Sequence, residues 1–332
     1  MIGWRRLGLD GPQILPIGLG TFSFSHAYGQ ADPGESGATL LRALELGCKL
    51  LDTADSYGGG ENEAWLGRVL EGRRNDVVLC TKVGLLWDSG GRVIGRNGRP
   101  EYIMQAVDAS LRRLRTDRLD VCTLHRADPN VPIEETVGAL AEVVRLGKVR
   151  VVGLSEVDKE QLLRAHGVHP IAVLQSEYSL WTRDPEAELI PLCKQLGIAF
   201  LAFSPLGRGM FAASPAASPP PQGDFRASLP RFQRGNFEKN LALTQQLASL
   251  AARRGYSPSQ FALAWVLRAG DHAFAIPGTR SQGHLEENMR ALKVHLYADD
   301  LSELARIFSR DSVAGERYSR SSVFNVTGYR WH

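Results

Sequence analysis

Short runs of apolar residues recur along the chain, and most of them lack the strict polar alternation of a half-exposed strand. The runs are rich in Val, Ile, Leu and Ala. Strands that are buried on both faces have this composition, and they belong to parallel sheets covered by helices. Eight strands are predicted, at residues 17–24, 49–54, 76–84, 119–125, 149–155, 171–178, 197–205 and 273–279.

Segments with helical periodicity separate these strands. From 100 to 114, apolar residues recur on one helical face, and Pro100 suits the first turn. Gly147 and Gly197 each follow such a segment and are predicted to end it, because glycine readily adopts the left-handed conformation common just after a helix. Nearly every predicted strand is therefore followed by a predicted helix.

Eight strand–helix units in one series predict a single (β/α)₈ barrel, an α/β fold, over residues 1–332. No Pro- or Gly-rich linker divides the series. A doubly wound open sheet is the alternative. That fold would normally have fewer strands per domain and a phosphate-binding loop after its first strand.

Three segments depart from the repeating pattern. Residues 4–17 predict a β-hairpin that turns at Asp10-Gly11 and plugs the bottom of the barrel. Residues 204–236 include an aperiodic stretch rich in Pro, Ala and Ser. Because it follows the carboxyl end of a strand, we expect a lid over the site. With a C-terminal tail at 309–332, these segments account for the length beyond the roughly 250 residues of a plain barrel.

Composition narrows the class of protein. The 332 residues include 39 Lys and Arg against 36 Asp and Glu, for a net charge of +3, and 43% are hydrophobic. This balance is typical of a globular protein, and the near-neutral charge argues against a nucleic-acid partner. No apolar run approaches the roughly 18 residues that a membrane span needs. No apolar stretch follows the arginines near the start, so we expect a cytoplasmic protein without a signal peptide.

The cysteines do not suggest a metal site. They lie far apart without any Cys-x-x-Cys pair, which predicts reduced, buried thiols: Cys48, Cys80, Cys122 and Cys193.

Four polar residues at or just after successive predicted strands form a chemically coherent set. They are Asp52, Tyr57, Lys82 and His125. Tyrosine is a weak acid with a free pKa of about 10. A nearby lysine ammonium would lower that pKa, and a carboxylate would keep the lysine charged. A histidine could orient a substrate carbonyl. Each residue alone could be structural, but the four together predict a site that protonates a polarised carbonyl.

These residues lie in motifs that resemble those of the aldo-keto reductase superfamily. The sequence GCKLLDTADSYGGGENEAWLG (47–67) is similar to the family's strand-two signature, TKVG (81–84) to its lysine motif and LHRADPNVPIEET (124–136) to its histidine motif. Four further segments, beginning at 153, 174, 203 and 276, resemble its cofactor segments. The resemblance runs from about Leu7 to Leu292. It is closest to the bacterial and plant members related to potassium-channel beta subunits.

The resemblance implies a role for each of these residues. Tyr57 would be the general acid, with Lys82 depressing its pKa, Asp52 pairing with Lys82, and His125 orienting the carbonyl. NADP(H) would bind in an extended pose. Its nicotinamide would meet Ser155, Gln175, Phe203 and Ser204, its pyrophosphate Leu206 and Arg208, and its adenosine 2′-phosphate and adenine Gly278, Arg280, His284, Glu287 and Asn288. A guanidinium at Arg280 favours NADP over NAD, since a fork of N–H donors suits a phosphate.

Two positions depart from the family pattern. Phe203 stands where many relatives have tyrosine, a change that preserves ring stacking. Glu156 stands where many have asparagine. Its carboxylate could accept a hydrogen bond from the nicotinamide carboxamide but could not donate one.

The substrate is expected to be a small aldehyde or ketone in an aromatic-lined pocket. Four residues are candidates for its wall: Phe22, Phe24, Trp87 and Trp181. Two other functions stay open. The resemblance also includes members that act as regulatory subunits, which implies as one alternative an NADP(H)-binding regulatory subunit of a larger assembly with vestigial reductase activity. The other is an aldolase-like enzyme with a Schiff base on Lys82. The sequence does not decide the substrate, the reaction direction or the oligomeric state.

Overall fold

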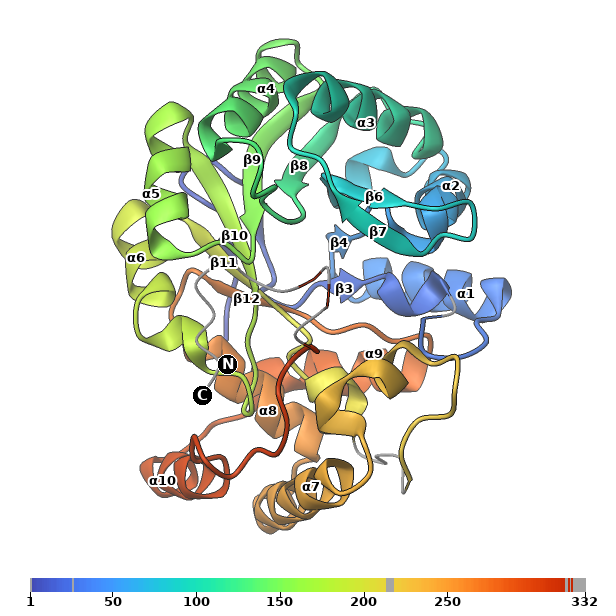
Figure 1. Cartoon of the computed structure of the whole chain (residues 1–332). Coiled ribbons are helices and arrows are strands. Elements are labelled where there is room, and N and C mark those ends of the chain that lie inside the picture. Colours follow the sequence, from blue (N-terminus) through green and yellow to red (C-terminus); the bar gives the residue numbers. More distant parts are fainter. Residues whose placement is uncertain (1, 26, 213–217, 320–321, 323, 325–332) are drawn as a thin grey trace.

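A computed structural model describes residues 2–25, 27–212, 218–319, 322 and 324. Eight parallel strands form its central sheet (Figure 1). In spatial order they are β3 (Leu19–Gly20), β4 (Leu50–Asp52), β5 (Val78–Val83), β8 (Leu119–Leu124), β9 (Val149–Ser155), β10 (Ile171–Glu177), β11 (Ala199–Phe203) and β12 (Ala273–Ile276). The amide of Gly18 donates to the carbonyl of Ala275 over 2.8 Å, which joins the first strand region to the last. The predicted (β/α)₈ barrel is therefore confirmed.

All eight predicted strands are present, although several are shorter than their apolar runs. The first run divides into β3 and a 3₁₀ helix, η1 (Phe22–Ser25). This shortening directs the residues after β3 toward the barrel mouth.

Helices surround the barrel, as Figure 1 shows. They are α1 (Pro33–Glu45), α2 (Glu61–Val69), α3 (Pro100–Arg113), α4 (Ile133–Arg145), α5 (Lys159–Val168), α6 (Leu189–Leu196), α7 (Asn236–Arg253), α8 (Pro258–Leu267), α9 (Gln282–Arg290) and α10 (Ala298–Ile307). Gly197 follows α6 with φ +68°, as its glycine predicted. α1 to α6, α8 and α9 bury apolar residues in the same cluster as the outward-facing residues of the strands.

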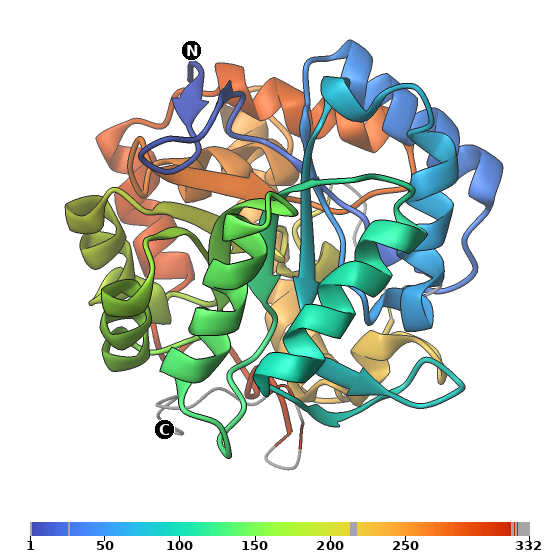
Figure 2. The ribbon, with the colours of Figure 1, turned by 90° about the horizontal axis from the view of Figure 1, so that it is seen from above.

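The N-terminal hairpin closes one end of the barrel. β1 (Arg5–Arg6) pairs antiparallel with β2 (Gln13–Ile14). Leu7 and Ile14 pack into the apolar cluster inside the barrel, beside residues such as Leu50 and Phe274. Figure 2 shows this hairpin at one end of the barrel and the C-terminal segment at the other.

The turn of this hairpin differs from the prediction. Arg6 pairs with Gln13, and the amide of Leu7 donates to the carbonyl of Pro12, so residues 8–11 form the connection. The turn is centred between Leu9 and Asp10 and is wider than the two-residue Asp10-Gly11 turn expected. Gly8, with φ +75°, supplies the left-handed residue that this wider turn uses.

A second hairpin follows β5 and was not predicted. β6 (Leu85–Trp87) pairs antiparallel with β7 (Val93–Arg96) beside the barrel mouth (Figure 1). The sequence signal was Gly90-Gly91 between two short apolar runs.

The C-terminal part of the chain forms a second apolar cluster outside the barrel. α7, α8 and α10 contribute to it, as does the segment after β11 through Phe211 and Phe232. Within the predicted lid, the described residues include the 3₁₀ helices η6 (Phe225–Ser228) and η7 (Pro230–Phe232). Residues 213–217 of that lid lie outside the described residues.

The thiols agree with the sequence interpretation, since all four cysteines are buried and free. In the part of the chain that the structure describes, no helix is long and apolar enough to cross a membrane.

Candidate active site

A cavity of about 840 Å³ opens at the carboxyl ends of the barrel strands. Residues at or near the carboxyl ends of β4, β8, β9, β10 and β11 contribute to its wall, among them Asp52, Tyr57, His125, Ser155, Gln175 and Phe203. The barrel thus brings together residues up to 151 positions apart in sequence (Asp52 and Phe203). The expectation that polar residues at strand ends share one site agrees with this geometry.

Lys82 is the centre of the polar cluster and is almost fully buried. Its Nζ donates to Asp52 Oδ2 over 2.6 Å, to the carbonyl of Thr53 over 2.8 Å and to Tyr57 Oη over 3.2 Å. Since an ammonium has three N–H donors, all of its hydrogen-bonding capacity is used. Asp52 is held in turn by Gln175 Nε2, 2.8 Å from its Oδ1.

Lys82 is protonated and positively charged at neutral pH. Burial alone lowers its pKa, but the Asp52 carboxylate and the Tyr57 hydroxyl together outweigh burial and raise the pKa of Lys82 above its ordinary value. A lysine must be neutral to attack a carbonyl. The aldolase-like alternative is therefore disfavoured.

Tyr57 is a weaker acid than the sequence led us to expect. Burial raises its pKa, and the nearby Lys82 ammonium, which lowers the pKa, does not offset burial. The prediction that Lys82 depresses the Tyr57 pKa holds for that one interaction but not for the net shift. At neutral pH the hydroxyl is protonated and available as a proton donor.

His125 is neutral beside this cluster. Burial, followed by the positive charges of Lys82 and Arg126, holds its pKa well below the ordinary value. Its Nδ1 lies 3.4 Å from Ser56 Oγ, and its ring lies edge-on to Tyr57 with centroids 6.1 Å apart. A neutral imidazole in this place can hydrogen-bond a carbonyl oxygen next to the tyrosine.

Local sequence explains how Tyr57 is presented. It begins the 3₁₀ turn η2 (Tyr57–Gly60), in which Gly58, Gly59 and Gly60 have φ of +58°, +61° and +94°. Three successive left-handed residues are readily tolerated only by glycine. This turn leads directly from the tyrosine into α2.

The residues expected at a nicotinamide lie together on the cavity wall. Ser155, Gln175, Phe203 and Ser204 lie at or near the carboxyl ends of neighbouring strands, and Leu206 lies just beyond Ser204. Ser204 has φ +49°, a costly conformation for a residue with a Cβ. Such strain is concentrated at functional sites. Because Gln175 uses its Nε2 on Asp52, its Oε1 is left to accept from a ligand.

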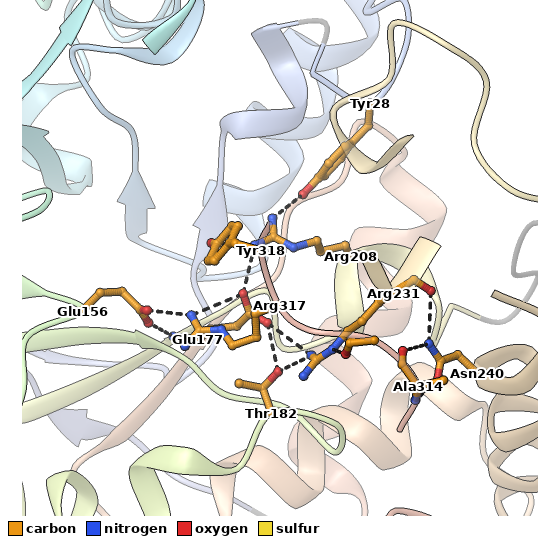
Figure 3. Close-up of polar contacts among 11 residues, drawn as sticks. Tyr28, Glu156, Glu177, Thr182, Arg208, Arg231, Asn240, Ala314, Arg317 and Tyr318 are labelled. Carbon is orange, nitrogen blue, oxygen red and sulfur yellow. Dashed lines mark hydrogen bonds and ion pairs between the residues drawn. The ribbon is translucent and has the colours of Figure 1, made fainter. Parts of the chain in front are cut away.

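Arg208 lines the cavity but is strongly tied to the protein (Figure 3). Its Nη2 lies 2.9 Å from Glu177 Oε2 and 2.9 Å from Tyr318 Oη, and its Nη1 lies 3.5 Å from Tyr28 Oη. Arg208, which was expected to contact the cofactor pyrophosphate, is therefore already paired with the buried carboxylate of Glu177.

The carboxylate of Glu156, which stands where many relatives have asparagine, is directed at protein groups and not into the cavity. Its backbone is left-handed, with φ +55°. One carboxylate oxygen accepts the amide of Glu177 over 2.6 Å and the other accepts Arg317 over 2.6 Å. It is absent from the residues that line the cavity, so its carboxylate is not available to a nicotinamide carboxamide.

The far end of the cavity lies along α9 and the residues before it. Gly278, His284, Glu287 and Asn288 line it. Arg280 stands beside them and donates to the carbonyls of Tyr28, Gly29 and Gln30. A helix N-terminus with an adjacent arginine is suited to an anion.

The family is decided by a match of the aldo/keto reductase family model to residues 16–308. The chain belongs to the aldo/keto reductase family. As a member of it, the protein is an NAD(P)-dependent oxidoreductase.

Solved aldo-keto reductases share its fold over nearly the whole chain. A glycerol dehydrogenase from Gluconobacter oxydans is 30% identical, with a TM-score of 0.84, and the match covers 96% of this chain and 99% of that one. An aldo-keto reductase from Bacillus halodurans, solved in its holo form, is 26% identical, with a TM-score of 0.77 and coverage of 97% and 99%. One from Klebsiella pneumoniae, in complex with NADP and acetate, is 27% identical, with a TM-score of 0.71 and coverage of 96% and 99%.

In this aldo-keto reductase, only one of the four aromatic residues expected in the substrate pocket lines the cavity. Phe22 does so, with its ring 4.9 Å from that of Tyr57. Phe24 packs on Trp65 instead, and Trp87 lies on β6 near Gly59. Trp181 is 5% exposed and belongs to the second apolar cluster. Phe24 and Trp181 do not line the cavity because each packs against apolar partners elsewhere.

Other aromatic residues line the cavity where these do not. Tyr28, Phe225, Tyr318 and Phe324 contribute to the wall, and Phe225 lies edge-on to both Phe22 and Phe324. Two of them come from the C-terminal tail, which shows no sequence motif. The signal that could have found them was the cluster of aromatic residues in an otherwise polar segment.

Proposed function

We propose that this protein is an NADPH-dependent carbonyl reductase, which converts a small aldehyde or ketone to an alcohol. The observation that carries the proposal is the hydrogen bond of 3.2 Å between the buried Lys82 ammonium and the Tyr57 hydroxyl, next to a neutral His125. The reaction consumes one hydride and one proton for each carbonyl reduced. NADPH supplies the hydride when bound.

The residues of the chain supply the proton and position the carbonyl. Tyr57 donates its hydroxyl proton to the carbonyl oxygen and becomes a phenolate. Lys82 stabilises that phenolate through its short contact, and Asp52 keeps Lys82 charged. His125 donates a hydrogen bond to the same oxygen and orients it. The phenolate then takes back a proton from solvent.

The cavity is suited to an extended dinucleotide. Its wall includes Tyr57, Phe203 and residues of α9, among them His284 and Asn288. Ser23 Oγ, on the wall of the same cavity, is buried without a hydrogen-bond partner among the described residues, and such an atom can bond a ligand. Ser155, Gln175 and Phe203 would hold the nicotinamide, and Arg280 with α9 the 2′-phosphate. Related structures contain NADP or NADPH, which supports the same choice here.

The regulatory alternative has less support. A vestigial enzyme has no need of a complete proton-donating group, whereas Asp52, Tyr57, Lys82 and His125 here are all in contact or adjacent.

The direct test is reduction of aldehydes by the purified protein with NADPH, followed at 340 nm. We expect turnover that falls at least a hundredfold in Tyr57→Phe, since positioned general acids contribute about 10²–10⁴. NADPH affinity, measured by fluorescence quenching, should change little in that variant. Undiminished turnover by Tyr57→Phe would overturn the proposed mechanism, and no turnover by the parent protein on a broad aldehyde panel would overturn the function.

A further inference from the structure

Arg126 places an almost fully buried positive charge on the wall of the cavity, directly after His125. The residue is 4% exposed. Its Nη1 donates to the carbonyl of His125 over 2.6 Å and to Ser155 Oγ over 3.1 Å. These are its hydrogen bonds to the described residues, and its buried Nε has no partner among them.

Among the described residues, no carboxylate neutralises this guanidinium. Within the described part of the chain, no Asp or Glu oxygen lies within 4.0 Å of it. Buried cations are normally paired, because an uncompensated charge in the interior is costly.

The other buried arginines of the described structure follow that rule. Arg317 lies 2.6 Å from Glu156, and Arg231 lies 3.7 Å from Glu177. Two buried acids of this region are already engaged, Asp52 by Lys82 and Glu156 by Arg317. Arg126 is thus an exception, and it is the one of the three that lines the cavity.

The remaining edge of the guanidinium has the form of a carboxylate site. With Nη1 engaged by His125 and Ser155, Nε and Nη2 are left to donate side by side, which matches the two oxygens of a carboxylate. Apolar surface adjoins this edge, because the guanidinium lies over the Phe324 ring at 5.9 Å and Phe225 packs against Phe324.

From this geometry we propose that the preferred substrate is a carbonyl compound that carries a carboxylate, which Arg126 binds. The inference rests on the proposed reductase function and names its substrate class. The carbonyl lies at Tyr57 and His125, the carboxylate at Arg126, and the carbon skeleton between them against the aromatic wall that includes Phe22, Phe225 and Phe324. Arg126 contributes to substrate binding and takes no part in the proton transfer.

A pair of matched aldehydes tests this proposal. 4-Formylbenzoate carries the charge, and its methyl ester is a neutral aldehyde of similar reactivity. We expect the protein to reduce 4-formylbenzoate with a kcat/KM at least tenfold above that of the ester, with the difference mainly in KM. In Arg126→Met, the ratio of kcat/KM for 4-formylbenzoate to kcat/KM for the ester should fall at least tenfold. In Arg126→Lys, part of this ratio should be retained.

A control variant removes a charge elsewhere. Arg112 is exposed on α3 and does not line the cavity, so Arg112→Met should keep the parent ratio. Thermal melting and NADPH affinity of each variant show whether it folds and binds cofactor. Equal or better reduction of the ester by the parent protein would overturn the proposal. An unchanged ratio of the two kcat/KM values in Arg126→Met would also overturn it. If that ratio is unchanged and only NADPH affinity falls, Arg126 contacts the cofactor and not the substrate.

Direct binding separates this inference from the reductase function. Isothermal titration with benzoate should show binding to the parent protein that is at least tenfold tighter than to Arg126→Met, with benzamide binding weakly to both. This result would support the anion site even if neither aldehyde is reduced, an outcome that would overturn the proposed function instead. Equal binding of benzoate and benzamide would overturn the anion site whatever the turnover.

Discussion

Glu156 and Arg317 form an ion pair of 2.6 Å across 161 positions of sequence, with both side chains almost fully buried (Figure 3). The pair connects the C-terminal tail to the residue after Ser155, at the end of β9. Arg317 also lies 3.5 Å from Glu177, which in turn pairs with Arg208. Asn240 of α7 holds the same tail through both the amide and the carbonyl of Ala314. The tail is therefore part of the wall of the site.

Removal of Arg317 should destabilise the protein strongly. Arg317→Met leaves Glu156 and Glu177 without that partner, and breaking a buried pair costs about 3–5 kcal/mol. Urea denaturation at neutral pH measures the loss. The double variant Glu156→Gln, Arg317→Met should be less destabilised than the sum of the single variants, because it leaves one fewer charge unpaired. Additive losses would contradict a direct interaction.

Glu177 should make stability depend on pH in the acid range. Burial raises the pKa of its carboxyl, but Arg317, Arg208 and Arg231, with a hydrogen bond from Thr182, outweigh burial and lower the pKa to about 2. A carboxyl whose folded pKa lies below its unfolded value stabilises the fold above the unfolded pKa of about 4.3, and this contribution is lost as the pH falls toward 2. The full contribution is on the order of 3 kcal/mol.

The variant Glu177→Gln provides the measurement. Its free energy of unfolding should fall below that of the parent protein by about that amount at pH 7, and the difference should narrow as the pH is lowered below 4.5. Exposed Glu61→Gln is a matched control, since Glu61 is exposed at the start of α2. A difference that stays constant from pH 7 to the most acidic pH at which both proteins fold would show that the pKa of Glu177 is not lowered.

The two reaction directions should respond differently to pH. Tyr57 is protonated at neutral pH because burial raises its pKa, and His125 is neutral because burial lowers its pKa. Neither group changes charge between about pH 7 and pH 8, so kcat for reduction should be nearly constant there. Alcohol oxidation needs the Tyr57 phenolate. As long as the pH is below the Tyr57 pKa, the phenolate fraction increases tenfold for each unit by which the pH rises, so the rate of oxidation should rise into the alkaline range. A maximum of oxidation at neutral pH would contradict this assignment.

Arg280 should determine the preference between the two nicotinamide cofactors. Arg280→Ala removes the guanidinium beside the N-terminus of α9, and we expect the Kd of NADPH to rise about 10- to 100-fold. The Kd of NADH should rise much less, because it has no 2′-phosphate. Arg280 also holds the carbonyls of residues 28–30, so equal weakening of both cofactors would indicate that its role is to hold that loop.

Local sequence predicted the repeating elements well. The runs predicted as strands at 76–84 and 119–125 contain β5 (Val78–Val83) and β8 (Leu119–Leu124), because a continuous apolar run is itself the signature of a strand buried on both faces. The hairpin turn at residues 8–11 and the strand pair β6–β7 were predicted less well. Their form depends on the register and on packing against the barrel, and a turn dipeptide alone specifies neither.

For the site, the sequence by itself determined which residues are available, at strand ends that a closed parallel barrel must bring to one face. Asp52, Tyr57, Lys82 and His125 followed from that rule. Tertiary structure decided what surrounds them. Arg317 engages Glu156, Glu177 neutralises Arg208, and Trp181 packs away from the cavity. Arg126 is buried with no carboxylate beside it in the described part of the chain. These pairings join segments far apart in the chain, and their energies depend on burial and on exact distances, which only the folded chain establishes.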